Sequence, residues 1–261
     1  MSGTITKILV RVIARDGKFL GDDVGGALVT IRDVHTGELL ASGRTTGGSG
    51  PTKGIMQTPR TRNQPIPTAD PPGNDACFFE ATLNLEAPKL VEIAALGPLA
   101  AQQSANRVSA TTWVYPGLGI APLDSPGGPI RTDGFLLEIP GLLVQVLSPP
   151  QHFDPFKPNP QMQIPISANV TMMCGCPINT DPWPESDFKV GASILHKGKT
   201  TNVALHFDDQ APVPSQFTAN WVPGDYGVFE ITVWAFQTST GNTGVDHTTV
   251  NLQAPSVRKA G

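Results

Sequence analysis

The most concentrated set of reactive side chains lies between residues 172 and 176, which read Met-Met-Cys-Gly-Cys. Thioethers and thiols are soft donors, and soft donors select Cu(I) over harder ions. Alternate side chains of an extended strand share a face, so Met172, Cys174 and Cys176 are expected to point one way and to form a candidate copper site. A metal-free alternative is a reversible disulfide between Cys174 and Cys176, for which Gly175 supplies the backbone freedom.

Two further interpretations of this cluster stay open. Met and Cys are ordinary fillers of irregular gaps in a core, and the cluster ends what reads as a core strand. One of the thiols could instead be a catalytic nucleophile, with His206 or His247 brought to it by the fold. A zinc site would need a second Cys or His pair at ligand spacing, and the sequence has none. Whether Cys77 approaches the other two thiols depends on the fold.

Trp183 stands between two prolines shortly after the cysteine cluster. A rigid aromatic side chain that is exposed in this way can bind a carbohydrate or a protein partner with little loss of entropy. The alternative is that Trp183 is the hydrophobic plug of its own loop. No residue pattern identifies an acid, a base and a nucleophile together, so the sequence leaves open whether the protein is an enzyme.

Composition excludes several classes of partner. The 261 residues carry a formal net charge of −4, which gives no general attraction for polyanions, so nucleic acid is not expected to bind. The longest apolar runs, such as 93–101, are far shorter than the roughly 18 residues of a membrane-spanning helix. No secretion signal is recognisable at the N-terminus, which favours a cytoplasmic protein with reduced thiols. Export without a cleaved signal is the alternative.

The remaining patterns predict an all-β protein of two antiparallel β-sandwich modules. Gly and Pro number 27 and 26, which suits many short strands joined by tight turns. We expect the first module over residues 1–147, interrupted by a long polar loop at 47–74 that is either a flexible insertion or a binding loop. A proline-rich linker is expected at 148–163, because dense prolines stiffen a chain into a spacer. The second module then covers 164–261, with six strand candidates at sandwich spacing.

The first 45 residues resemble the transthyretin-like or carboxypeptidase-regulatory-like sandwich. The resemblance rests on the strand ending in Ala-Arg-Asp16-Gly17-Lys18, the strand Gly26-Ala-Leu-Val-Thr-Ile31, and the segment that begins Thr36-Gly37-Glu-Leu-Leu. It implies a fold and no particular activity, because one sandwich scaffold carries many functions.

The second module resembles immunoglobulin-like repeats of bacterial cell surfaces. In the segment Asp225-Tyr-Gly-Val-Phe229-Glu-Ile231, Phe229 takes the place of the corner tyrosine and Ile231 that of the second core cysteine. Trp221 or Trp234 is expected to fill the core in place of the disulfide. Only the fold is carried over from this resemblance.

These observations favour a non-catalytic binding or assembly protein, whose sandwiches bind a protein partner or form a homo-oligomer. Apolar edge strands such as 135–147 support an oligomer, because open edges must be covered. A soft-metal or thiol-redox protein that uses Met172, Cys174 and Cys176 is the first alternative. An enzyme with a site at the interface of the modules is the second. No cofactor is required by the sequence, and copper is the one that it allows.

Overall fold

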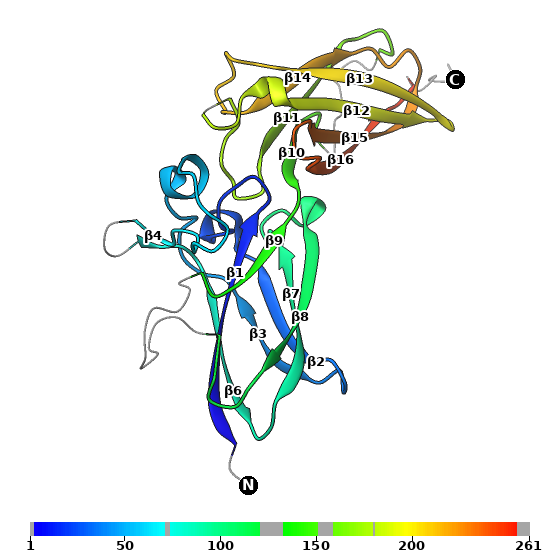
Figure 1. Ribbon diagram of the computed structural model, residues 1–261. Helices are drawn as coiled ribbons and strands as arrows, with labels where there is room; N and C mark the ends of the chain where they lie inside the picture. Colours follow the sequence, from blue (N-terminus) through cyan, green and yellow to red (C-terminus); the bar gives the residue numbers. More distant parts are fainter. Residues whose placement is uncertain (1–2, 71–73, 121–132, 151–158, 180, 255–261) are drawn as a thin grey trace. The chain divides into compact units, whose positions relative to one another are not determined.

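The computed structural model describes residues 3–70, 74–120, 133–150, 159–179 and 181–254 (Figure 1). The chain forms two compact units. Unit 1 comprises Met1–Gly141 together with Met172–Cys176, and unit 2 comprises Leu142–Thr171 together with Pro177–Gly261. Strands dominate the described residues, with only short helical turns between them, which confirms the all-β sandwich class.

The strands of unit 1 belong to two main sheets and one small hairpin. They are β1 (Thr4–Ala14), β2 (Leu28–Asp33), β3 (Leu39–Arg44), β4 (Ala69–Asp70), β5 (Asn74–Asp75), β6 (Phe79–Leu85), β7 (Lys89–Gly97), β8 (Asn106–Val114) and β9 (Phe135–Ile139). One sheet has the order β6-β1-β9 and the other the order β3-β2-β7-β8. The first is not wholly antiparallel, because β9 pairs with β1 in parallel. Three short helical turns are η1 (Asp22–Val24), η2 (Lys53–Gln57) and η3 (Gln102–Ser104).

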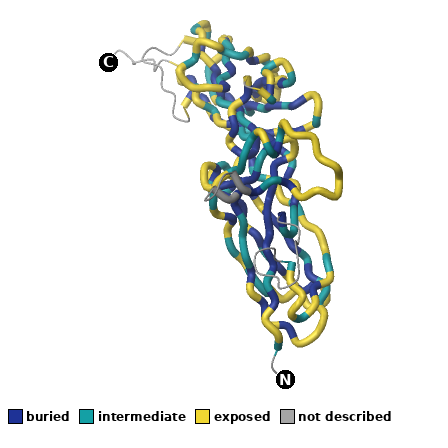
Figure 2. Tube along the Cα trace, turned by 60° about the vertical axis from the view of Figure 1, so that its left-hand side comes forward, coloured by how far each residue is buried: buried dark blue, intermediate teal, exposed yellow. Residues whose placement is uncertain are grey.

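Strand β1 is buried on both of its faces from Ile8 to Ala14. Ile8, Val10 and Val12 occupy one face, and Leu9, Arg11 and Ile13 occupy the other, as the period of two requires. In many of the other strands, buried residues alternate with intermediate and exposed ones (Figure 2). The opposite sheet of the sandwich can cover only one face of β1, so another part of the chain must pack on the other face.

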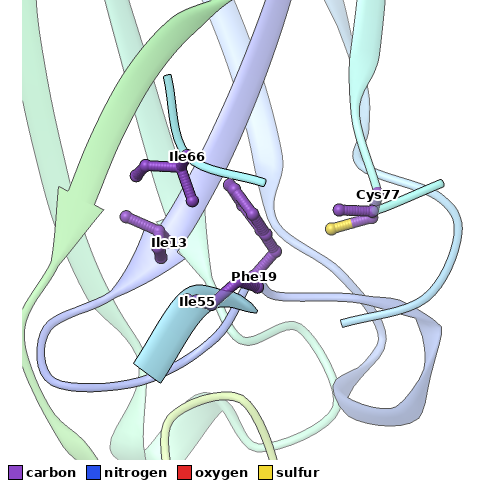
Figure 3. Close-up of a cluster of buried hydrophobic side chains, with 6 residues drawn as sticks. Ile13, Phe19, Ile55, Ile66 and Cys77 are labelled. Atoms are coloured by element: carbon purple, nitrogen blue, oxygen red, sulfur yellow. The ribbon is translucent and has the colours of Figure 1, made fainter. Parts of the chain in front are cut away.

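The long loop at 47–74 supplies part of that cover. Ile55 in η2 and Ile66 pack in one buried cluster with Ile13 and Phe19 (Figure 3). Both loop residues are less than 9% exposed. The middle of the loop, residues 57–65, is exposed. The loop is therefore anchored to the core by two isoleucines, and only its middle fits the expected polar insertion.

Arg11 is a buried cation on the same face of β1 as Ile13. Its guanidinium donates hydrogen bonds to the backbone carbonyls of Ala76 and Cys77, the latter at 3.0 Å. Its Cζ atom also lies 5.2 Å from the centre of the Phe78 ring. Arg11 therefore ties β1 to the segment that leads into β6, and backbone oxygens and aromatic rings are among the groups that receive its buried charge.

Unit 2 contains one curved seven-stranded sheet. Its strands are β10 (Leu142–Ser148), β11 (Ile164–Met172), β12 (Phe188–His196), β13 (Lys199–Phe207), β14 (Gln216–Trp221), β15 (Gly227–Gln237) and β16 (Thr243–Leu252), with the short turn η4 (Glu185–Asp187) before β12. The order is β10-β11-β14-β13-β12-β15-β16, and β10 also contacts β15 and β16. The sheet thus bends back on itself, and β13 joins β14 only through residues 206 and 207.

The core of unit 2 contains the residues that were expected to replace a disulfide. Phe229 and Ile231 are 2% and 1% exposed, and Trp221 packs edge-on against Phe229 with ring centres 4.9 Å apart. Trp234 is only partly buried on the opposite face of β15, where its indole lies over Gly191. Of the two candidate tryptophans, Trp221 is therefore the one in the core.

The division of the chain differs from the expected ranges at two places: strand β10 belongs to unit 2, and the segment Met172–Cys176 belongs to unit 1. Pro140 and Gly141 split the apolar segment 135–147 into β9 and β10, as their sequence predicts. Strand β10 pairs with β11, so the segment beyond Gly141 belongs to unit 2. Half of the expected linker 148–163, namely residues 151–158, lies outside the described residues. In the described part of the chain no helix is long and apolar enough to cross a membrane.

The role of Arg11 predicts a large effect of its removal. Replacing Arg11 by Leu strands two buried carbonyl oxygens, so we expect a loss of about 3 kcal/mol in the free energy of unfolding of unit 1. Urea unfolding of the full chain, followed through the amide hydrogen exchange of residues 76–83, measures the change. Arg15→Leu is the matched control, because the ion pair of Arg15 with Glu138 is exposed. Equal losses in both variants would contradict the assignment.

Candidate functional sites

Strand β8 is a long edge strand whose side chains are mostly exposed. It has nine residues, and in the sheet order it pairs only with β7. Five residues at its centre, 108–112, are Val, Ser, Ala, Thr and Thr, and they include no charge. Trp113 near its end is 53% exposed, and Tyr115 and Leu118 follow at 50% and 73%. Among the described residues no strand is hydrogen-bonded to the outer edge of β8, although β9 lies near it and the Asn106 side chain donates to the carbonyl of Pro140 at 3.0 Å. A strand edge without a partner strand can accept one.

The segment with two cysteines forms a tight turn. Strand β11 ends at Met172, and Gly175 has a φ of +78°, in the left-handed region that favours glycine. The N–H of Gly175 donates to the carbonyl of Met172 at 2.8 Å, and the N–H of Met172 donates to the carbonyl of Cys176 at 2.9 Å. This is the three-residue hairpin loop in which a turn is followed by a left-handed glycine. The expected extended strand through 172–176, with alternate side chains on one face, is therefore wrong.

The turn brings the two thiols together inside unit 1. The Sγ atoms of Cys174 and Cys176 lie 2.7 Å apart, and the two residues are 2% and 8% exposed. Met172 and Met173 are fully buried. A disulfide requires a separation of about 2.05 Å, so only a small approach of the two sulfur atoms is needed to form one.

The pKa values of the two thiols are shifted in opposite directions by their surroundings. Burial works to raise the pKa of Cys174, but hydrogen bonds from the Cys176 thiol and from the backbone N–H of Lys18 outweigh it. The pKa of Cys174 is therefore lowered to about 7. The pKa of Cys176 is raised, because its proton is held by Cys174 and because it is buried. At neutral pH Cys174 is therefore partly ionised beside the protonated Cys176, and a thiolate beside a thiol is the state that thiol–disulfide exchange requires.

The geometry suits a disulfide better than a bound metal ion. Two thiolates that share a tetrahedral ion at about 2.3 Å stand about 3.8 Å apart, farther than the sulfurs do here. Among the described residues no group of three His, Cys, Asp or Glu side chains is placed to hold a metal. Cys77 therefore does not complete a three-thiol site. Copper binding by Met172, Cys174 and Cys176 stays a prediction that requires the turn to open.

Cys77 lies in a different environment. Its Sγ donates to the carbonyl of Leu20 at 3.0 Å, and it belongs to the buried cluster of Ile13 and Phe19 (Figure 3). Burial raises the pKa of Cys77 to about 12, although Arg11 works in the opposite direction. Cys77 is thus a packing residue with an unreactive thiol.

Trp183 does not form an exposed platform. It is 3% exposed, and its carbonyl accepts a hydrogen bond of 2.7 Å from the N–H of Asn179. The exposed-platform hypothesis for Trp183 therefore has no support, and its indole fills the loop as the alternative described. Strand β8 and its Trp113 were not singled out in the sequence, although the run of Ser, Ala and Thr before an exposed Trp is the signal that could have indicated an edge.

Comparisons with known proteins identify no family. No protein-family model matches the sequence, and no curated protein matches it. Among solved structures, the fibronectin(III)-like modules of Clostridium thermocellum CbhA are similar over 95% of this chain and 94% of theirs, at 11% identity and a TM-score of 0.27. A TM-score so low supports no inference about this chain.

The turn predicts a specific cost for filling the position of Gly175. A Cβ atom there would lie 2.9 Å from Cγ1 of Val24, whereas a Cβ at Gly37, with a similar φ of +75°, would meet nothing within 4 Å. Both substitutions to Ala destabilise the chain because a Cβ atom is unfavourable in the left-handed backbone region. Only Gly175→Ala adds a steric clash. We expect Gly175→Ala to lower the free energy of unfolding of unit 1 by at least about 1 kcal/mol more than Gly37→Ala does. Similar losses in both would show that the turn has room to adapt.

Proposed function

We propose that this chain is a non-catalytic assembly protein that pairs with a second copy of itself through strand β8. The observation that carries the proposal is the open edge of β8, which has nine residues, an uncharged centre and no proline. Natural proteins usually protect such an edge with Lys, Pro, a bulge or a covering loop. An edge that lacks these in its middle is suited to accept another strand.

The sequence of β8 is complementary to itself in an antiparallel pairing centred on Ala110. In that register Arg107 of one copy faces Trp113 of the other, and Ser109 faces Thr111. All four lie on one face of the strand, because their numbers differ by multiples of two. A guanidinium beside an indole and two hydroxyls in contact are favourable cross-strand pairs. The register also places the two exposed tryptophans at the two ends of the shared sheet.

The two family resemblances belong to this proposal as well. We propose a transthyretin-like sandwich for unit 1 and an immunoglobulin-like sandwich for unit 2. In unit 2, the strands β10-β11-β14 and β13-β12-β15-β16 can be divided into three and four, which is the division of an immunoglobulin-like fold. Folds of this type carry many functions, so they support assembly without specifying it.

Charging the centre of β8 is expected to abolish self-association. The double variant Ser109→Lys, Thr111→Lys puts four positive charges side by side in the proposed pairing. Sedimentation equilibrium over a hundredfold range of concentration should show a dimer for the unmodified chain and a monomer for the variant. Ser42→Lys on β3, the opposite edge of the same sheet, is the control and should leave the dimer intact. A chain that stays monomeric throughout, or a dimer that survives in the double variant, would overturn the proposal.

A second candidate function is a thiol–disulfide couple at Cys174 and Cys176, favoured by the Sγ–Sγ distance of 2.7 Å. The Cys174 thiolate would attack one sulfur of a disulfide oxidant, form a mixed disulfide and release one thiolate. The Cys176 thiol would then transfer its proton to that released thiolate. Its sulfur would attack Sγ of Cys174 and release the second half of the oxidant as a thiolate. Two electrons pass from the protein to the oxidant, which leaves as one thiol and one thiolate, and water protonates the thiolate according to its pKa.

The pKa values predict which thiol reacts and at what pH. Alkylation of the folded protein by iodoacetamide should modify Cys174 first, with a rate that rises through pH 7 and not through pH 9. Cys77 should stay unmodified below the range of its raised pKa. Mass spectrometry of peptides after timed labelling measures both. In the Cys176→Ser variant the hydroxyl still donates to Cys174, so the profile should persist, but oxidised glutathione should then yield only a mixed disulfide. If oxidised glutathione forms no disulfide between Cys174 and Cys176 in the unmodified chain, this candidate function is excluded.

A further inference from the structure

A pocket of about 260 Å³ lies at one end of unit 2. It is found where the β12–β13 hairpin turns and where β14 ends. Trp221, Phe229 and Ile194 form its apolar part, and Lys199 and Thr201 lie beside them. This site is separate from strand β8 and from the dithiol turn, both of which belong to unit 1.

The position of Lys199 in this pocket follows from the strand register. Thr201 pairs with Ile194, and Lys199 pairs with His196, so each pair shares one face of the sheet. Ile194 is buried at 2%, which identifies this face as the one directed to the core. Residues 199–202 are nevertheless exposed, because β13 meets β14 only farther along, at 206 and 207. The inner face of the sheet is uncovered there, and a lysine stands at its opening.

The wall of the pocket is held by a network around Asp225. Its carboxylate lies 2.6 Å from Nζ of Lys197 and 3.4 Å from Nε2 of His196. The hydrogen bond from Lys197 and the backbone N–H of Tyr226 lower the pKa of Asp225 to about 2. The His196 ring also stacks on Phe229 at 4.0 Å, and its Nδ1 lies 2.8 Å from the carbonyl of Val228. The wall is thus formed before any ligand binds.

One cation without an ion-pair partner within the described residues lines the same pocket as the aromatic side chains. Lys197 neutralises Asp225, whereas Lys199 has no ion-pair partner among the described residues of the chain. A ligand that complements this arrangement has a negative group for Lys199 and a flat apolar body for Trp221. The volume is below the range of about 300 to 1,000 Å³ that holds drug-sized ligands, so the ligand must be small.

We infer that this pocket binds a small aromatic carboxylate, with the carboxylate on Lys199 and Thr201 and the ring on Trp221. Charge complementarity decides the sign of the ligand, and the aromatic side chains decide its shape. The Lys197–Asp225 pair positions the wall without contacting the carboxylate. The inference does not depend on the assembly through β8, because it concerns another unit.

Benzoate is the probe, and benzamide is its neutral analogue. Titration of the ¹⁵N-labelled full chain by NMR should shift the indole N–H of Trp221 and the amides of residues 194–201 with benzoate, and much less with benzamide. Lys199→Gln should weaken benzoate binding at least about fivefold. Lys189→Gln, on the outward face of the same strand pair, is the control and should bind benzoate as the unmodified chain does.

Three results would overturn the inference. These are equal shifts with benzoate and benzamide, undiminished binding in Lys199→Gln, and no shift of Trp221 at tens of millimolar benzoate. Unchanged amide positions elsewhere in unit 2 show that Lys199→Gln is folded, so a loss of binding reports the lost charge. The self-association of the chain is measured separately and is expected to be the same with and without benzoate.

Discussion

Strand β1 imposes the main constraint on unit 1, because both of its faces are buried along most of its length. One face is covered by the opposite sheet. The other must be covered by something else, and the chain uses the long loop with Ile55 and Ile66, together with Arg11 holding the carbonyls before β6. A loop that packs as a third layer explains why so polar a segment contains two buried isoleucines. It also explains why a cation is accepted inside an apolar unit.

The same arrangement leaves the edges of unit 1 unequal. Strand β1 takes β6 and β9 as its neighbours, and the loop covers the outer side of that sheet near Ile13. The opposite sheet ends at β8, whose central side chains are small, uncharged and largely exposed. Burial is thus concentrated around β1, and β8 is an exposed edge of the opposite sheet. The proposed assembly through β8 would cover that edge and part of the apolar surface of Trp113.

Much of the fold could be predicted from the sequence. All six strand candidates of the second module correspond to observed strands, because their side chains alternate and glycine or proline bounds them. The apolar segment 135–147 breaks at Pro140 and Gly141, because proline cannot donate into a central ladder. Which unit its second half joins could not be predicted, since the pairing of β10 with β11 is a tertiary choice that periodicity does not encode.

The sites were predicted less well, and the reasons are local. The period of two was extended through 172–176, although Gly175 is the residue that a three-residue hairpin loop requires. That turn, and not an extended strand, brings the two thiols together. For Trp183 the sequence left open an exposed platform and a buried loop plug, because flanking prolines fix a backbone and do not decide what packs on the ring. The pocket at Lys199 joins residues from four strands and from the two segments that connect them, so no motif of adjacent residues could indicate it.

Assembly through β8 is tested most directly by a cysteine at the centre of the proposed pairing. In the Ala110→Cys variant, the two introduced thiols of a dimer would face each other across the symmetry axis, within the Cα separation of about 4.4 to 6.8 Å that a disulfide needs. Mild oxidation should convert this variant to a covalent dimer on a non-reducing gel, while Ser42→Cys on β3 stays monomeric. Cross-linking of Ala110→Cys that is no faster than that of Ser42→Cys would contradict the pairing of β8 with itself.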